Sequence, residues 1–168
     1  MLIDTSPLGW GAWRERINSM SKSEDKPPRH NKPAERRTCS PPRADGSMRF
    51  WRMDQLWPLA QGLPVKKIPL RDLECLNEVC WFGGPLNLRP TCRSVAEHAR
   101  DIYNADLSYP IILSPKGDVL DGMHRICKAF LLGLEEIDAV QIVEMPAPRG
   151  RLLPNGEEAA YSGEDGTI

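Results

Sequence analysis

The run Asp-Gly-Met-His-Arg at positions 121–125 is the part of this 168-residue chain whose residue types and spacing could do chemistry. Two apolar residues before it are typical of the end of a strand, and a helical pattern after it continues to Gly133. The run should therefore lie at a helix start, where unpaired N–H groups and the helix dipole favour an anion, most often phosphate. Gly122 lets the backbone approach such a ligand, and Arg125 can hold two phosphate oxygens at once.

Asp121 leaves two alternatives open. If its carboxylate caps the helix, it occupies the N–H groups and repels a phosphate, and the site binds no anion. If it points away, it can act on a hydroxyl group or a magnesium ion. His124 is expected to donate to a phosphate oxygen or to act as an acid or base near neutral pH. Lys128, one turn further on, either adds positive charge to the site or is simply solvated.

An Asp-Gly-x-His-Arg run between a strand and a helix resembles the phosphate-binding motif of the ParB/sulfiredoxin-like superfamily. Together with strand-like segments at 65–70, 109–113 and 137–142, the resemblance covers roughly residues 50–145. It implies binding of a nucleotide (ATP, ADP or CTP), with or without Mg²⁺, through its phosphates. The residues that would hold the ligand are Gly122, Met123, His124, Arg125 and Lys128.

Within that superfamily, the motif looks closest to members that bind adenine nucleotide and phosphorylate a small hydroxyl substrate, such as free serine. This resemblance implies catalytic roles for Asp121, His124 and a glutamate after the first strand, which is Glu78 or its competitor Glu74. Sulfiredoxin chemistry is not expected, because Met123 stands where those enzymes have a cysteine. Specific DNA binding is not expected either, since partition proteins carry an Arg-rich motif and a following helix-turn-helix domain.

Composition limits the classes of protein that the chain can belong to. The net charge of -1 provides no basic field for nucleic acid. No apolar run approaches the ~20 residues needed to span a membrane, and the N-terminus lacks a signal-peptide pattern. Five cysteines at irregular spacings argue against both a disulfide framework and a metal site. We therefore expect a soluble cytoplasmic protein without a metal centre.

The chain should contain one folded domain, at residues 48–145, between two disordered ends. Residues 21–47 lack Val, Ile, Leu, Met, Phe, Trp and Tyr, so they cannot bury enough apolar surface to offset ordering. Trp10 and Trp13 before them form either a docking motif or non-native sequence, and Met48 could be the biological start. The proline-containing, acidic stretch 146–168 is predicted to be a disordered tail.

Periodicity and capping signals predict three helices, near 55–61, 91–104 and 122–133, and four strands. The strands are expected at 65–70, 111–113, 119–120 and 137–142. This order gives a small α+β domain with helices around a mixed sheet.

Two aromatic features lie outside the motif. The loop 75–90 contains Trp81 and Phe82 beside a Gly-Gly pair, which is typical either of a lid over a substrate or of a loop pinned to the core. His98 lies next to the apolar stripe of its helix and is expected to be a partly buried structural residue.

Three functions are consistent with these patterns. The first is a nucleotide- or phosphate-binding domain that acts as a small-molecule kinase or NTPase. The second is a non-enzymatic module that senses a nucleotide and docks a partner, because no second domain is apparent. The third is a ParB-like, DNA-associated protein of the partition or nuclease kind, against which the balanced charge argues.

Overall fold

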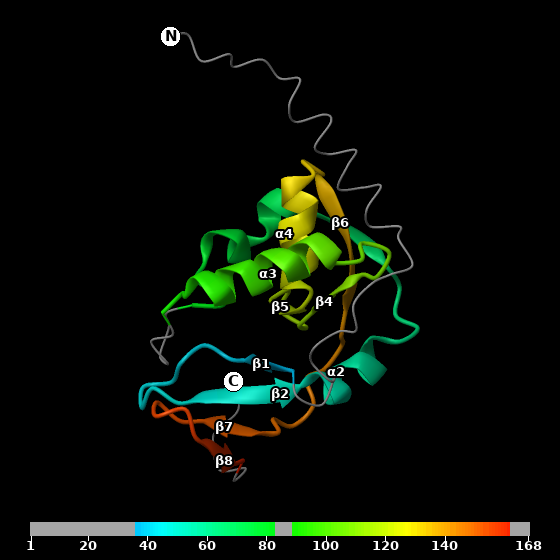
Figure 1. The fold of residues 1–168 in the computed structure, drawn as a ribbon. Coiled ribbons are helices and arrows are strands. Elements are labelled where there is room, and N and C mark those ends of the chain that lie inside the picture. The colour runs from blue at the N-terminus through cyan, green and yellow to red at the C-terminus, as the bar shows by residue number, and fades with distance from the viewer. Residues whose placement is uncertain (1–35, 83–88, 162–168) are drawn as a thin grey trace, which may run out of the picture.

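The computed structural model describes residues 36–82 and 89–161. They form an α+β arrangement of two four-stranded sheets and three α-helices (Figure 1). The predicted α+β class is confirmed. The sequence predicts only one of the two sheets, however, and the second depends on segments outside the predicted domain.

The predicted mixed sheet has the strand order β3-β6-β4-β5. Its strands are β3 (Lys66–Pro69), β4 (Ile111–Leu113), β5 (Val119–Asp121) and β6 (Glu136–Gln141). β4 and β6 run parallel, while β3 pairs with β6 and β5 with β4 in antiparallel fashion. All four strands coincide with segments that the sequence predicts, and β5 ends at Asp121.

Three α-helices accompany this sheet: α2 (Met53–Ala60), α3 (Cys92–Asn104) and α4 (Met123–Leu131). α3 begins where the sequence predicts, because the Thr91 hydroxyl accepts a hydrogen bond from the Ser94 amide. α3 and α4 pack against each other beside the mixed sheet (Figure 1). This packing brings residues of α3 close to the motif at the start of α4.

The core is divided between the two faces of the mixed sheet, as the period of two in a strand requires. Ile111 and Leu113 of β4 pack with Ile126 of α4 on one face. Ile112, between them, packs with Leu56 of α2 on the other. The sheet therefore fixes the position of α4 relative to α2. No helix in the described residues is long and apolar enough to cross a membrane.

A second, antiparallel sheet has the order β1-β2-β7-β8 and forms its own layer (Figure 1). Its strands are β1 (Arg37–Cys39), β2 (Met48–Arg52), β7 (Gly150–Leu152) and β8 (Glu158–Ala160). Three of these strands have only three residues and little apolar content, so they carry no periodicity that would reveal them in the sequence.

The predicted domain boundaries at 48 and 145 are therefore wrong, because the ordered fold extends past both. β2 lies between β1 and β7, and the pairing satisfies backbone groups that would otherwise be exposed along both of its edges. The prediction of a disordered tail at 146–168 is wrong where β7 and β8 form. Residues 1–35 and 162–168 lie outside the described residues.

Candidate functional site

The chain passes from β5 into α4 through Gly122, which has a positive φ of 118° and precedes the first helical residue. A Cβ at this position would lie 2.5 Å from Cγ2 of Ile111. Glycine is therefore required both by the backbone conformation and by the close approach of β4. This local geometry fixes the direction in which the first turn of α4 points.

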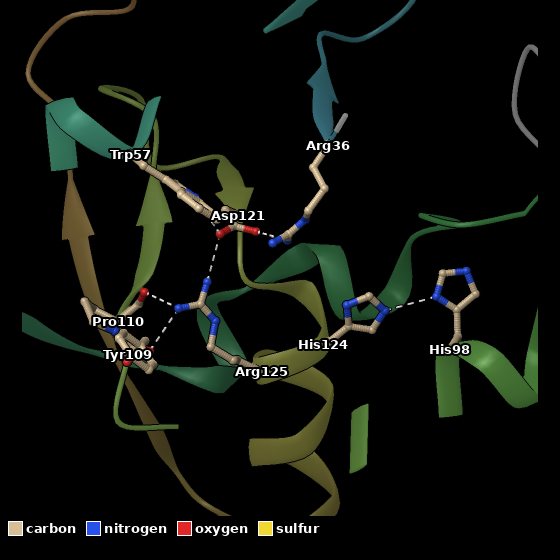
Figure 2. Close-up of polar contacts among 8 residues, drawn as sticks. All are labelled: Arg36, Trp57, His98, Tyr109, Pro110, Asp121, His124 and Arg125. Carbon is tan, nitrogen blue, oxygen red and sulfur yellow. Dashed lines mark hydrogen bonds and ion pairs between the residues drawn. The ribbon is translucent and has the colours of Figure 1, made fainter. Parts of the chain in front are cut away.

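Asp121 does not use its carboxylate to cap α4. Its side chain is 7% exposed, and Oδ1 accepts a hydrogen bond from Nη2 of Arg36 at 2.6 Å (Figure 2). Oδ2 accepts from Nε1 of Trp57 at 3.2 Å and from Nη2 of Arg125 at 3.1 Å. Of the two alternatives for Asp121, the structure has the one in which the carboxylate points away. These three bonds occupy three of the roughly four acceptor positions of the carboxylate.

Arg125 joins α4 to the segment that leads into β4. Its Nη1 donates to the backbone carbonyls of Tyr109, at 3.1 Å, and of Pro110, at 2.6 Å, while Nη2 pairs with Asp121 (Figure 2). Its side chain is 15% exposed. The guanidinium that the sequence predicts to bind two phosphate oxygens thus donates, in this structure, to oxygens of the protein.

Arg36 is a site residue that sequence reasoning missed. It lies immediately before β1, in a stretch predicted to be disordered, and its side chain is 32% exposed. Its guanidinium pairs with Asp121 and lies 5.8 Å from the ring centre of Trp57. No local signal distinguishes it from the neighbouring arginine, since its partner is 85 residues further along the chain.

His124 is paired with His98 of α3. Nε2 of His124 and Nδ1 of His98 are 3.0 Å apart, so one ring donates a hydrogen bond and the other accepts it (Figure 2). Trp81 stacks on both imidazoles, with ring centres 4.3 Å from His98 and 4.7 Å from His124. Phe82 contacts His98 edge-on. His98 is partly buried, as the sequence predicts, and it contacts the candidate site through His124.

Trp81 belongs to the loop 75–90, for which the sequence left open a lid or a loop pinned to the core. Its stacking on the two imidazoles agrees with a pinned loop. Residues 83–88, which include the Gly-Gly pair of the proposed lid, lie outside the described residues.

Both imidazoles have a pKa below the ordinary histidine value, mainly because burial disfavours the charged form. Asp101 opposes this by raising the pKa of both rings, and Arg36 lowers that of His124 further. Glu97 raises the pKa of His98, and Asp121 raises that of His124. The pair is therefore neutral at pH 7, and a proton added to both rings would abolish their hydrogen bond.

This arrangement predicts a loss of stability in mild acid. The unfolded chain takes up protons at about pH 6.5 while the folded pair does not, so stability falls as the pH drops below that value. Between pH 7.5 and 5, the melting temperature should fall by a few degrees more in the wild type than in His98→Phe, which keeps an aromatic ring but loses a titrating group. Equal decreases would contradict a role for the pair.

Lys128 does not add charge to a ligand site at the start of α4. It is 4% exposed, and its Nζ donates to the carbonyls of Tyr103 at 2.9 Å and Ala105 at 2.7 Å. A cation at these carbonyls satisfies acceptors at the C-terminal end of α3 and complements the helix dipole. Lys128 is thus neither a ligand-binding cation nor a solvated side chain, the two roles that the sequence left open, but a buried structural residue.

Met123 and Glu78 lie in different surroundings. Met123 is partly buried and packs against the core cluster around Ile126, so its side chain is a core contact. Glu78 follows the second of two 3₁₀ turns, η2 (Leu70–Asp72) and η3 (Glu74–Asn77). Burial raises the pKa of the Cys75 and Cys80 thiols, and the Glu78 carboxylate near them raises both further. Within residues 36–82 and 89–161, no hydrogen bond or ion pair joins Glu78 to Asp121.

The cysteines are all free, and burial is the main cause that raises the pKa of Cys75 to about 11. A thiol with such a pKa is protonated at neutral pH and is a poor nucleophile. Within residues 36–82 and 89–161, no group of three or more His, Cys, Asp and Glu side chains is placed to hold a metal ion.

The site therefore contains two guanidiniums, one carboxylate and two neutral imidazoles around the beginning of α4 (Figure 2). No family model, curated protein or solved structure matches this chain. A function has to be inferred from this geometry.

Proposed function

We propose that this protein is a phosphate-recognising domain that binds a nucleotide, or another phosphorylated small molecule, at the first turn of α4. The observation that carries the proposal is the convergence of Arg36 and Arg125 on the single carboxylate of Asp121, directly beside that helix start. Both guanidiniums lie beside the positive end of the α4 dipole, which favours an anion.

Arg36 is the group best placed to change partners. Its side chain is about one-third exposed, whereas that of Arg125 is 15% exposed and tied to two backbone carbonyls. Arg36 also affects the pKa of His124, so the two side chains are within electrostatic reach of each other. A phosphate at the first turn of α4 could accept hydrogen bonds from Arg36 and from His124 in its protonated or donating form.

A second candidate function, transfer of a phosphoryl group to a small hydroxyl substrate, is favoured by the position of Oδ1 of Asp121. This atom accepts its hydrogen bond from Arg36. Movement of Arg36 onto a bound phosphate would release Oδ1 toward an acceptor hydroxyl or a magnesium ion, as phosphoryl transfer requires. The same movement of Arg36, from Asp121 to the phosphate, would then serve both binding and catalysis.

The test compares Arg36→Gln with Arg37→Gln. The two arginines are adjacent, their side chains are both 32% exposed, and both form ion pairs. Arg36 pairs with Asp121 at the site, whereas Arg37 pairs with Glu158 of β8, within the second sheet. ATP, ADP, CTP, GTP and inorganic phosphate are titrated with and without Mg²⁺. We expect Arg36→Gln to weaken the tightest ligand at least tenfold, as the loss of roughly 1.5–3 kcal/mol for a charged hydrogen bond implies. Arg37→Gln should change its affinity less than twofold.

Equal effects of the two substitutions, or no binding of any of these ligands to the wild type, would contradict the proposal. Catalysis is tested separately, as consumption of bound ATP or ADP in the presence of hydroxyl amino acids and other small alcohols. Wild-type protein that binds a nucleotide and consumes none over hours would support a binding module and remove the kinase candidate for that panel.

A further inference from the structure

An open apolar groove lies away from Asp121, between the C-terminal half of α4 and the turns η2 and η3. Its volume is about 780 Å³. Among the side chains that line it are Leu70, Leu73, Leu76, Ile102, Phe130 and Leu131. Among the lining residues, Phe130 is 63% exposed, Leu131 49% and Leu134 45%. Large apolar side chains exposed together beside a concave surface mark an interaction site.

The chain itself contains a segment whose pattern fits such a groove. Trp10, Trp13, Ile17 and Met20 follow one another at spacings of three, four and three residues, which places them on one face of a helix. Ser6-Pro7 before them is typical of a helix start. These residues lie outside the described part of the structure. Their spacing is that of an amphipathic helix that binds in an apolar groove.

The connection to the domain is long enough for this segment to reach the groove of its own molecule. Residues 21–35 separate it from Arg36, which is fixed by its ion pair with Asp121. Fifteen residues span up to about 50 Å when extended. A domain of about 120 residues has a radius of gyration of only ~14 Å. Every part of the surface is therefore within reach, and the tether keeps the effective concentration of the segment high.

Charges at the edge of the groove complement those of the segment. Glu135 and Glu136 belong to the groove lining, and the segment carries Arg14 and Arg16 between its apolar residues. Arg71 at the groove and Glu15 in the segment form a further pair of opposite sign. Such complementarity favours one register over others more than it adds affinity.

We propose that residues 10–20 bind, as an amphipathic helix, in the groove between α4 and the turns η2 and η3 of the same molecule. The bound segment covers Phe130 and Leu131 with its tryptophans. This contact is independent of the phosphate site, because it uses other residues of α4.

The test is hydrogen–deuterium exchange on the full chain, with Phe130→Arg compared with Val143→Arg. Both replaced side chains are strongly exposed, at 63% and 83%, so both variants should fold, but only Phe130 lines the groove. We expect amides 10–20 to exchange at least fivefold faster in Phe130→Arg than in the wild type. They should exchange at the wild-type rate in Val143→Arg.

A second variant, Trp13→Ala, probes the contact from the other side. It lies outside the described domain, and amides 127–134 should exchange faster when it removes an apolar contact from the groove. Equal exchange of amides 10–20 in the wild type and Phe130→Arg would overturn the proposal. Protection that rises with protein concentration would also overturn it, because the segment would then occupy the groove of a second copy.

Discussion

Asp121→Asn should lower the free energy of unfolding by about 3 kcal/mol, as measured by urea denaturation. The carboxylate is 7% exposed and accepts hydrogen bonds from Arg36, Trp57 and Arg125. Its neutral replacement leaves two guanidiniums without their common counter-charge. Removal of one partner from a buried pair costs ~3–5 kcal/mol, and the exposure of Arg36 places the expected loss at the low end of this range.

Asp138→Asn is the matched control for this substitution. Asp138 also forms an ion pair, with Lys67, but that pair lies on the surface, where solvent screens it. The control should leave stability nearly unchanged. If both variants lost the same free energy, the network around Asp121 would not be the element that holds α4, Arg36 and Trp57 together.

Asp121→Asn also separates a catalyst from a binding module when it is assayed at a temperature where it is folded. A binding module should keep or improve its affinity for phosphate, because a negative charge beside the ligand is removed. A kinase should lose turnover steeply, because the group that orients the acceptor hydroxyl or holds magnesium is gone. The measurement is nucleotide affinity and nucleotide consumption on the same preparation.

Gly122→Ala should be at least as damaging, with a loss of about 3–4 kcal/mol of stability. A positive φ costs a non-glycine residue ~1–3 kcal/mol. The new Cβ would also lie 2.5 Å from Cγ2 and 2.8 Å from Cβ of Ile111, which is fully buried in the core. Overpacking of this kind adds ~1–3 kcal/mol. Urea denaturation of the variant gives the number.

Gly117→Ala separates the cost of the positive φ from the cost of overpacking against Ile111. Gly117 also has a positive φ, of 97°, but nothing lies within 4 Å of a Cβ built there. It should therefore show the conformational cost without the steric one, at about 1–2 kcal/mol. A difference between the two variants measures the close approach of β4 to the start of α4, and no difference would mean that Ile111 moves aside freely.

The sequence by itself determined the elements whose signals are local. The four strands of the mixed sheet, the start of α3 at its Thr91 cap and the strand-to-helix junction at Gly122 all follow from residues within a few positions of one another. Apolar periodicity, capping side chains and glycine conformation act over such short distances. The motif at 121–125 was located in the sequence for the same reason.

Only the tertiary structure decided what the side chains of that motif contact. Arg36 reaches Asp121 across 85 residues, and His98 reaches His124 across 26. Lys128, which has the charge expected of a ligand-binding residue, is instead buried against the end of α3. A polar side chain is satisfied by whichever partner the packing brings near, and a local sequence pattern does not contain that information.

The second sheet illustrates the same limit for the backbone. β1, β7 and β8 are three residues long; β1 pairs with the next strand, β2, and β8 with the preceding strand, β7, while the β2–β7 pairing joins the two ends of the domain. Their stability comes from ladder hydrogen bonds and from Phe50 and Leu152 in a small core. Intrinsic strand preference contributes less than such neighbours do. Local signals in the sequence therefore locate the motif, while long-range pairing decides how far the fold extends and which arginine completes the site.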